Sequence, residues 1–127
     1  MRLLLDTSVL IDHLRHHSGA VELLLDANER GDELWGVVLT RTEVLGGMRS
    51  AERRRTLLLL DSVAWIDVTT ELADRAGELA RKYRASHRGI DLVDYTIAAA
   101  AEAIKAKLVT RNVRHFPMFE GLEPAYR

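Results

Sequence analysis

The sequence contains no cysteine among its 127 residues. This absence excludes disulfide bridges, zinc sites built on thiolates and a cysteine nucleophile, and it suits a protein kept in a reducing compartment. Long apolar runs are absent as well. The leucines at positions 3–5 form a segment far shorter than the core of a signal peptide, and no run approaches the length that spans a membrane. We therefore expect a cytoplasmic protein that has no contact with a membrane.

An excess of one charge sign is also lacking, because 18 Lys and Arg residues face 19 Asp and Glu residues, for a net charge of −1 at pH 7. No overall basic field argues for nucleic acid, although a local basic patch is enough to bind it. Hydrophobic residues make up 47% of the chain and charged residues 29%, as in ordinary globular proteins. No linker, repeat or low-complexity segment divides the sequence, so we expect residues 1–127 to form a single domain.

Short apolar runs alternate with segments of helical periodicity along the whole chain. Strands are expected at residues 2–5, 33–39, 64–68 and 108–110, with a short fifth strand near Leu122. Helices are expected at about residues 8–15, 19–30, 40–47, 50–61, 70–86 and 91–105. Strands that alternate with helices pair in parallel through right-handed crossovers. The fold class is therefore α/β, with a mostly parallel central sheet and helices on both faces.

Three acidic residues share one local setting. Asp6 directly follows the first strand, and Glu43 and Asp94 lie in the first turns of later helices. In open α/β sheets, ligands bind in the crevice at the carboxyl ends of the strands. Three carboxylates at one sheet edge repel each other unless a cation lies between them. The pattern therefore predicts a site for a hard divalent cation, Mg²⁺ or alternatively Mn²⁺, because such ions prefer oxygen ligands.

Each acid also has a purely structural interpretation. Asp6 occupies a position where aspartate caps a helix. Glu43 lies three residues after Thr40, and Asp94 lies three residues after Asp91, which is the spacing of a capping box. A helix N-terminus favours a negative charge by only ~0.3–1 kcal/mol. This preference explains why each acid is tolerated, but not why three acids share the same setting.

An ordered set of segments resembles the PIN-domain nucleases and, more narrowly, the VapC ribonuclease toxins of bacterial type II toxin–antitoxin systems. These segments are Leu4–Ser8, Thr42–Glu43, Asp91–Ala100 and Thr110–Phe116. The resemblance covers essentially the whole chain and lies in the order and spacing of the segments. It implies a PIN-like three-layer fold and a metal-dependent endoribonuclease. By the same resemblance, Asp6, Glu43 and Asp94 are the catalytic residues that bind the metal.

The polar neighbours of these acids are expected to support the same chemistry. The resemblance implies that a metal-activated water would attack the scissile phosphate in line, which would leave a 5′-phosphate and a 3′-hydroxyl. Thr7, Ser8 and Thr110 are candidates to orient the carboxylates, although Thr7 suits a helix cap equally well. Asn112 stands where many PIN domains carry a fourth acid. Because an amide brings no charge, we expect it to contact the metal weakly or through water, and the number of metal ions stays open.

Four basic residues are candidates to bind the RNA phosphates, since arginine pairs with phosphate through two hydrogen bonds. These residues are Arg41, Arg111, Arg114 and His115. The denser basic clusters at 53–55 and 81–88 are interpreted as solvated helix faces. The resemblance further implies a cognate VapB-like antitoxin and a homodimer.

Leu57–Leu60 cover more than one face of a helix. Either neighbouring helices cover both sides, or the run contacts a partner with Arg53–Arg55 as a polar rim.

Two other classes of protein stay open at this point. A phosphoryl-receiver-like signalling domain has a similar length and an acidic Mg²⁺ pocket, and Asp67 would be its acceptor. Such a domain carries two adjacent acids after its first strand, whereas this chain has Asp6 followed by Thr7. The second class is a PIN-like binding module without catalysis. The presence of all three acids argues against it.

Overall fold

The computed structural model describes every residue from 1 to 127 and has a single four-stranded sheet. Its strands are β1 (Arg2–Leu5), β2 (Glu33–Val37), β3 (Ala64–Ile66) and β4 (Lys107–Val109). They lie in the order β3-β2-β1-β4, and each neighbouring pair is parallel. The α/β fold with a parallel central sheet is thereby confirmed. The first strand in the sequence lies inside the sheet, and the last one pairs directly with it.

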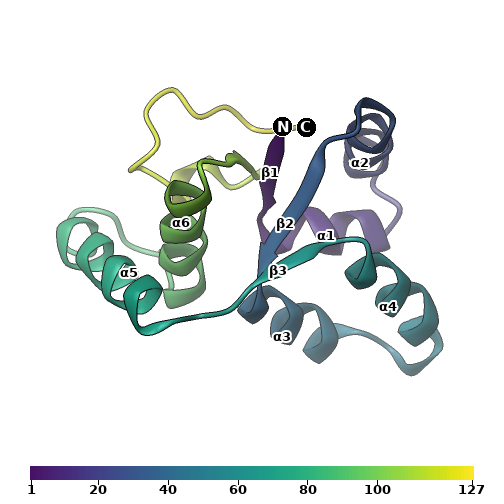
Figure 1. Ribbon diagram of the computed structural model, residues 1–127, viewed down its shortest axis with the longest axis horizontal. Helices are drawn as coiled ribbons and strands as arrows, with labels where there is room; N and C mark the ends of the chain where they lie inside the picture. The colour runs from purple at the N-terminus through teal and green to yellow at the C-terminus, as the bar shows by residue number, and fades with distance from the viewer.

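Helices cover both faces of the sheet, so the molecule has three layers (Figure 1). The helices are α1 (Thr7–Leu14), α2 (Ser18–Arg30), α3 (Val38–Gly47), α4 (Arg53–Asp61), α5 (Thr70–Tyr83) and α6 (Leu92–Ile104), with 3₁₀ turns at Ser50–Glu52 and Val113–His115. In Figure 1, α5 and α6 lie to one side of the strands and α1 to α4 to the other. None of these helices has both the length and the apolar character needed to cross a bilayer.

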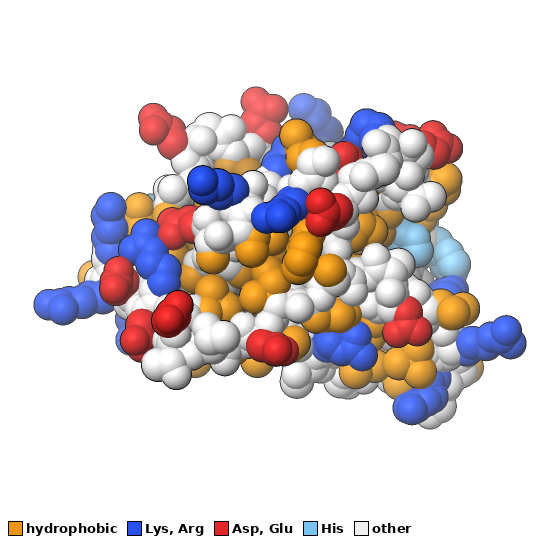
Figure 2. All heavy atoms as spheres, in the orientation of Figure 1, with side chains coloured by type: hydrophobic (Ala, Val, Ile, Leu, Met, Phe, Trp, Pro, Cys, Tyr) orange, Lys and Arg blue, Asp and Glu red, His pale blue; other side chains and the backbone are white.

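The alternation of side chains along β1 builds a separate core on each face. Leu4 packs with the residues of α5 and α6, whereas Leu3 and Leu5 pack with α1, α2 and α4. Successive strand residues point to opposite faces, so a strand buried on both sides is apolar throughout. On the face shown in Figure 2, hydrophobic side chains gather over the centre, and charged side chains of both signs lie around the outline.

The start of α3 differs from the expectation. The helix begins at Val38, two residues before the expected start, and Thr40 therefore lies inside it. The N-cap position belongs to Val37, whose side chain makes no capping hydrogen bond, so the capping box from Thr40 to Glu43 does not form. Instead, the buried hydroxyl of Thr40 lies 2.9 Å from that of Thr7. A tertiary hydrogen bond has replaced the local one.

The expected fifth strand near Leu122 is wrong. Residues 121–127 contain no strand, and the segment joins the end of β4 through one backbone hydrogen bond, from Ala125 N–H to the Thr110 carbonyl at 2.9 Å. Gly121 has a φ of +72°, and Pro124 lacks the N–H that a ladder requires. The local geometry therefore prevents continuous pairing along β4.

The leucine run in α4 is buried on one side only. Leu60 is fully buried, Leu57 and Leu59 are half-buried, and Leu58 is 62% exposed. Neighbouring helices therefore do not cover both sides of the run. Leu58, which lies next to Arg53 and Arg54, is the leucine of this run that a partner could contact.

Candidate active site

Asp6 lies at the carboxyl end of β1 and is held by hydroxyl groups. It occupies the N-cap position of α1, but its side chain makes no capping hydrogen bond. Its carboxylate is only 4% exposed. The Ser8 hydroxyl donates to Asp6 Oδ2 at 2.8 Å, and the Thr110 hydroxyl donates to the same oxygen at 2.7 Å. The Asp6 side chain therefore does not cap α1; its carboxylate is held instead by the hydroxyl groups of Ser8 and Thr110.

Asp94 lies in the first turn of α6 and forms a reciprocal capping box with Asp91. The Asp94 N–H donates to Asp91 Oδ1 at 2.9 Å, and the Asp91 N–H donates to Asp94 Oδ2 at 3.1 Å. His115 Nδ1 lies 3.1 Å from the same Asp94 oxygen. Asp94 thus has the capping function that the spacing predicted, but it also lies buried next to other charged groups.

Burial raises the pKa of the Asp94 carboxyl to about 7, and the nearby negative charges of Asp91 and Asp6 add to the rise. The backbone N–H of Asp91 and the imidazole of His115 act in the opposite direction but do not cancel it. Two conclusions follow. Asp6 and Asp94 lie within electrostatic reach of each other, and their surroundings supply too little positive charge for two buried carboxylates.

Glu43 lies on α3 and is exposed. The Thr7 hydroxyl donates to Glu43 Oε1 at 2.6 Å, and Thr7 directly follows Asp6 in the chain. This bond places Glu43 near Asp6, while the charged groups that act on Asp94 are Asp91, His115 and Asp6. The three acids do not form a closed cage, because no group of three His, Asp or Glu side chains has the geometry to hold a metal ion.

The donor set nevertheless fits a hard cation that keeps part of its water shell. Each buried acid is bonded through its Oδ2 atom. Asp6 Oδ2 accepts from Ser8 and Thr110, and Asp94 Oδ2 accepts from the Asp91 N–H and contacts His115. This leaves Oδ1 of Asp6 and Oδ1 of Asp94 without a protein donor. Mg²⁺ is commonly held by one or two carboxylates together with several waters. A cation here would gain two such ligands and would neutralise the buried negative charge.

The four basic candidates have different surroundings. Arg41 is half-buried and stacks over the Trp65 ring at 5.1 Å. Arg111 Nη1 lies 2.9 Å from Asp12 Oδ2. His115 contacts Asp94, as described above, and Arg114 is exposed. Arg41 and Arg114 form no ion pair with a carboxylate, and of these two only Arg114 is exposed.

The side-chain amide of Asn112 forms no hydrogen bond with the acids. Its backbone N–H donates to the Thr110 hydroxyl at 2.9 Å, and the residue is exposed. The same Thr110 oxygen therefore accepts from Asn112 and donates to Asp6.

The sequence did not indicate a role for Asp12 or Tyr126, which lie near the site. The carboxylate of Asp12, on α1, accepts hydrogen bonds from Arg111 at 2.9 Å and from the Tyr126 hydroxyl at 2.7 Å. These partners lie 99 and 114 positions away from Asp12 in the chain. No local motif marks either pair, so only the folded structure reveals them.

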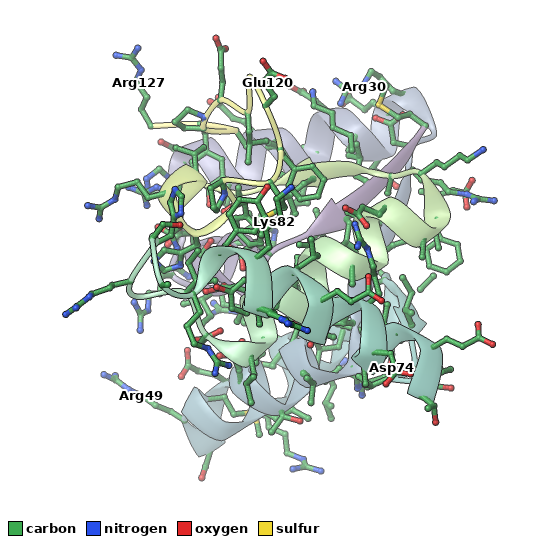
Figure 3. The ribbon with its side chains drawn as sticks, turned by 90° about the vertical axis from the view of Figure 1, so that its left-hand side faces the viewer. Arg30, Arg49, Asp74, Lys82, Glu120 and Arg127 are labelled. Atoms are coloured by element: carbon green, nitrogen blue, oxygen red, sulfur yellow. The ribbon has the colours of Figure 1, made fainter.

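A cavity of about 480 Å³ opens beside Glu43. Its walls come from α1, α3, the 3₁₀ turn at Ser50–Glu52 and α4, and they are partly apolar, with Ile11 and Val44, and partly charged, with Arg15 and Arg49. Arg49 projects away from the protein in Figure 3. Glu43 therefore lies at a concave surface, which is where ligands usually bind.

Asp67 does not share this site. It follows the edge strand β3, which β2 separates from β1, and its side chain is exposed. The acidic pair expected of a phosphoryl-receiver domain is thus absent.

Comparison with known proteins agrees with this architecture. Residues 3–119 match the PIN domain family. Ribonuclease VapC19 of Mycobacterium tuberculosis is 46% identical over 123 residues, which is 97% of this chain and 98% of that protein. Ribonuclease VapC10 of the same organism is 46% identical over 124 residues, or 98% of this chain and 92% of that protein.

Solved structures agree as well. A toxin–antitoxin complex from Klebsiella pneumoniae superposes with a TM-score of 0.77 and 25% identity over 98% of each chain. VapBC2 from Rickettsia felis, solved with a DNA fragment from its promoter, has a TM-score of 0.77 and 22% identity over 98% of this chain and 97% of that one. The chain therefore belongs to the PIN domain family, in the group that contains the VapC ribonucleases.

Proposed function

We propose that this protein is a metal-dependent endoribonuclease, a VapC-like toxin that a cognate VapB-like antitoxin neutralises. One observation carries the proposal. Asp6 and Asp94 are buried close together, each with one carboxylate oxygen that has no protein donor. The 46% identity to Ribonuclease VapC19 over nearly the whole chain supports RNA as the substrate.

Asp6 and Asp94 would hold the ion, Mg²⁺ or Mn²⁺, and Glu43 would complete the acidic site from α3. When bound, such an ion activates a water and stabilises negative charge on the scissile phosphate. The protein supplies the geometry. Ser8 and Thr110 fix the Asp6 carboxylate, and the hydroxyl of Thr7 fixes Glu43. Cleavage by water leaves a 5′-phosphate and a 3′-hydroxyl.

The RNA would lie across the concave surface beside Glu43. Arg114 is the basic candidate most available to a phosphate, because it is exposed and forms no ion pair. Arg41, Arg111 and His115 already contact Trp65, Asp12 and Asp94, so a direct contact with RNA requires them to exchange partners.

The remaining features concern assembly. We propose that residues 1–127 act as one domain, that the protein forms a homodimer in the cytoplasm, and that the antitoxin covers part of the surface near the acids. The solved relatives are toxin–antitoxin complexes, which supports an antitoxin as the partner.

The test is cleavage of a defined RNA by the purified protein, with Mg²⁺ or Mn²⁺ present and then removed by EDTA. We expect cleavage only with metal, new ends that carry 5′-phosphates, and inhibition by the antitoxin. Asp6→Asn should be inactive, whereas Asp67→Asn, a change at an exposed acid away from the site, should cleave like the parent. RNA that binds but stays intact under all metal conditions would instead identify a binding module without catalysis.

A further inference from the structure

The last residues of the chain are fastened to the turn that follows β4. The Ala125 N–H donates to the carbonyl of Thr110 at 2.9 Å. One residue further on, the Tyr126 hydroxyl donates to Asp12 Oδ2 at 2.7 Å, and Arg111 donates to the same oxygen at 2.9 Å. We call Ala125 and Tyr126 the C-terminal clamp. Through a backbone bond and a shared carboxylate, the clamp holds two successive residues of the turn.

The Tyr126 side chain occupies a fitted position. The Arg111 guanidinium lies 5.5 Å from the centre of its ring, and the His17 ring lies 5.1 Å away. Gly19, in the first turn of α2, approaches so closely that a Cβ there would lie 2.8 Å from Tyr126 Cδ2. Contacts on several sides, one of which requires a glycine, indicate a tightly packed anchor.

Asp12 is the charged centre of this anchor. Burial alone would raise its pKa, but the hydrogen bonds from Tyr126 and Arg111, together with the positive charges of Arg111 and His17, outweigh burial and lower the pKa below its ordinary value. The carboxylate therefore stays ionised near neutral pH and accepts both hydrogen bonds there. Hydrogen bonds to an ionised acceptor are stronger than those between neutral groups.

The clamp is connected to the acidic site through a single residue, Thr110. Thr110, whose carbonyl accepts from Ala125, is the residue whose hydroxyl donates to Asp6 at 2.7 Å. The same hydroxyl oxygen accepts from the Asn112 N–H. The position of the Thr110 side chain, and with it the orientation of the Asp6 carboxylate, thus depends on a turn that the clamp holds from outside.

We infer that Tyr126 is a positioning residue for the nuclease site, which acts through the turn at residues 110–112 to orient Asp6 toward the metal. The inference rests on the proposed function. It also changes the role of Arg111, which serves as part of the anchor and does not contact the RNA. Loss of a group that orients a metal ligand typically lowers metal affinity on the order of 10–100-fold.

The test measures Mn²⁺ affinity by calorimetry on the purified protein without RNA. Tyr126→Ala should weaken binding on the order of 10-fold. Tyr126→Phe keeps the ring against Arg111 and His17 and should lose less. The matched control is Arg127→Ala, since Arg127 is the next residue and projects away from the protein in Figure 3.

A general loss of stability is separated from positioning by a double-mutant cycle. Thr110→Val removes the hydroxyl that holds Asp6 and keeps the side-chain shape. In this background Tyr126→Ala should weaken Mn²⁺ binding little further, because both changes act through the same bond. Parent-like affinity in folded Tyr126→Ala, or losses that simply add, would overturn the inference. If Tyr126→Ala does not fold, Tyr126→Phe takes its place in the same cycle.

A parent protein that binds no Mn²⁺ would contradict the proposed metal-dependent function, and the clamp is then judged by hydrogen exchange. The Asn112 amide, bonded to the Thr110 hydroxyl, should exchange faster in Tyr126→Ala than in the parent, while the amides of β1 keep their protection. Equal exchange at Asn112 in both proteins would show that the clamp does not hold the turn.

Discussion

The imidazole Nδ1 of His115 lies 3.1 Å from Oδ2 of Asp94, so the 3₁₀ turn after β4 is joined to the first turn of α6. The sequence suggested separate roles for the two residues: RNA binding for His115 and metal binding for Asp94. Because burial raises the pKa of Asp94 to about 7, this contact involves a carboxyl group whose charge changes near neutral pH.

This raised pKa predicts how the stability of the metal-free protein depends on pH. The Asp94 carboxyl has an ordinary pKa of 3.8 when unfolded and about 7 when folded. Between these values the folded protein holds one more proton, so Asp94 makes the free energy of unfolding fall as the pH rises. Urea denaturation in EDTA at a series of pH values measures the effect. Asp94→Asn should flatten the pH dependence across this window, and an unchanged profile in the variant would refute the assignment.

Removal of either buried carboxylate should abolish activity without unfolding the protein. In Asp6→Asn and in Asp94→Asn a metal ligand loses its charge, and we expect both RNA cleavage and growth toxicity to disappear. The metal-free variants should be as stable as the parent or more stable, since repulsion between the two acids is relieved. Thermal denaturation in EDTA confirms folding. A folded variant that cleaves at the parental rate would disprove the acidic site.

Asn112 should matter less than Asp94. Its side chain forms no hydrogen bond to the acids, and a neutral amide attracts a cation less than a carboxylate does. We therefore expect Asn112→Ala to retain more cleavage activity than Asp94→Asn when both are measured at saturating metal. Equal losses would indicate that the amide is a required ligand.

The leucine run in α4 should separate stability from binding. Leu60 is fully buried, and its replacement by alanine should lower the free energy of unfolding by about 2–5 kcal/mol. Leu58 is 62% exposed, so Leu58→Glu should change stability by no more than about 0.5 kcal/mol. Under the proposed function, the same variant should bind the antitoxin more weakly, as measured by titration. The result would contradict this if folded Leu58→Glu and Leu59→Glu both bind the antitoxin and self-associate like the parent. The run would then only fill the core.

Local patterns were sufficient for most of the fold and for the expectation that Asp6 follows a strand and Asp94 begins a helix. The first strand is observed at residues 2–5 as expected, because a short apolar run followed by a polar turn has few other solutions. Asp6 follows the end of a strand and Asp94 lies at the start of a helix, and the two carboxyl groups interact electrostatically. In parallel α/β sheets these points converge on one edge.

The errors arise where a distant contact overrides a local preference. Thr40 has the spacing of a helix cap but forms its hydrogen bond with Thr7, which is 33 positions away. Arg111 has the composition of a phosphate-binding residue but pairs with Asp12 across 99 positions. No local feature of the sequence signals such pairs, because the partners are brought together only by the tertiary fold.

The position of β1 between β2 and β4 also determines the order in which the molecule can be completed during synthesis. Two hydrogen bonds of the folded protein, from Thr110 to Asp6 and from Tyr126 to Asp12, join residues that are 104 and 114 positions apart. Contacts so far apart in sequence cannot form until the later partner has been made. A growing chain on the ribosome therefore carries Asp6 long before the hydroxyl that orients it exists. Under the proposed function, a nascent chain that has not yet reached Thr110 lacks the hydroxyl that fixes Asp6, and we expect it to have no nuclease activity.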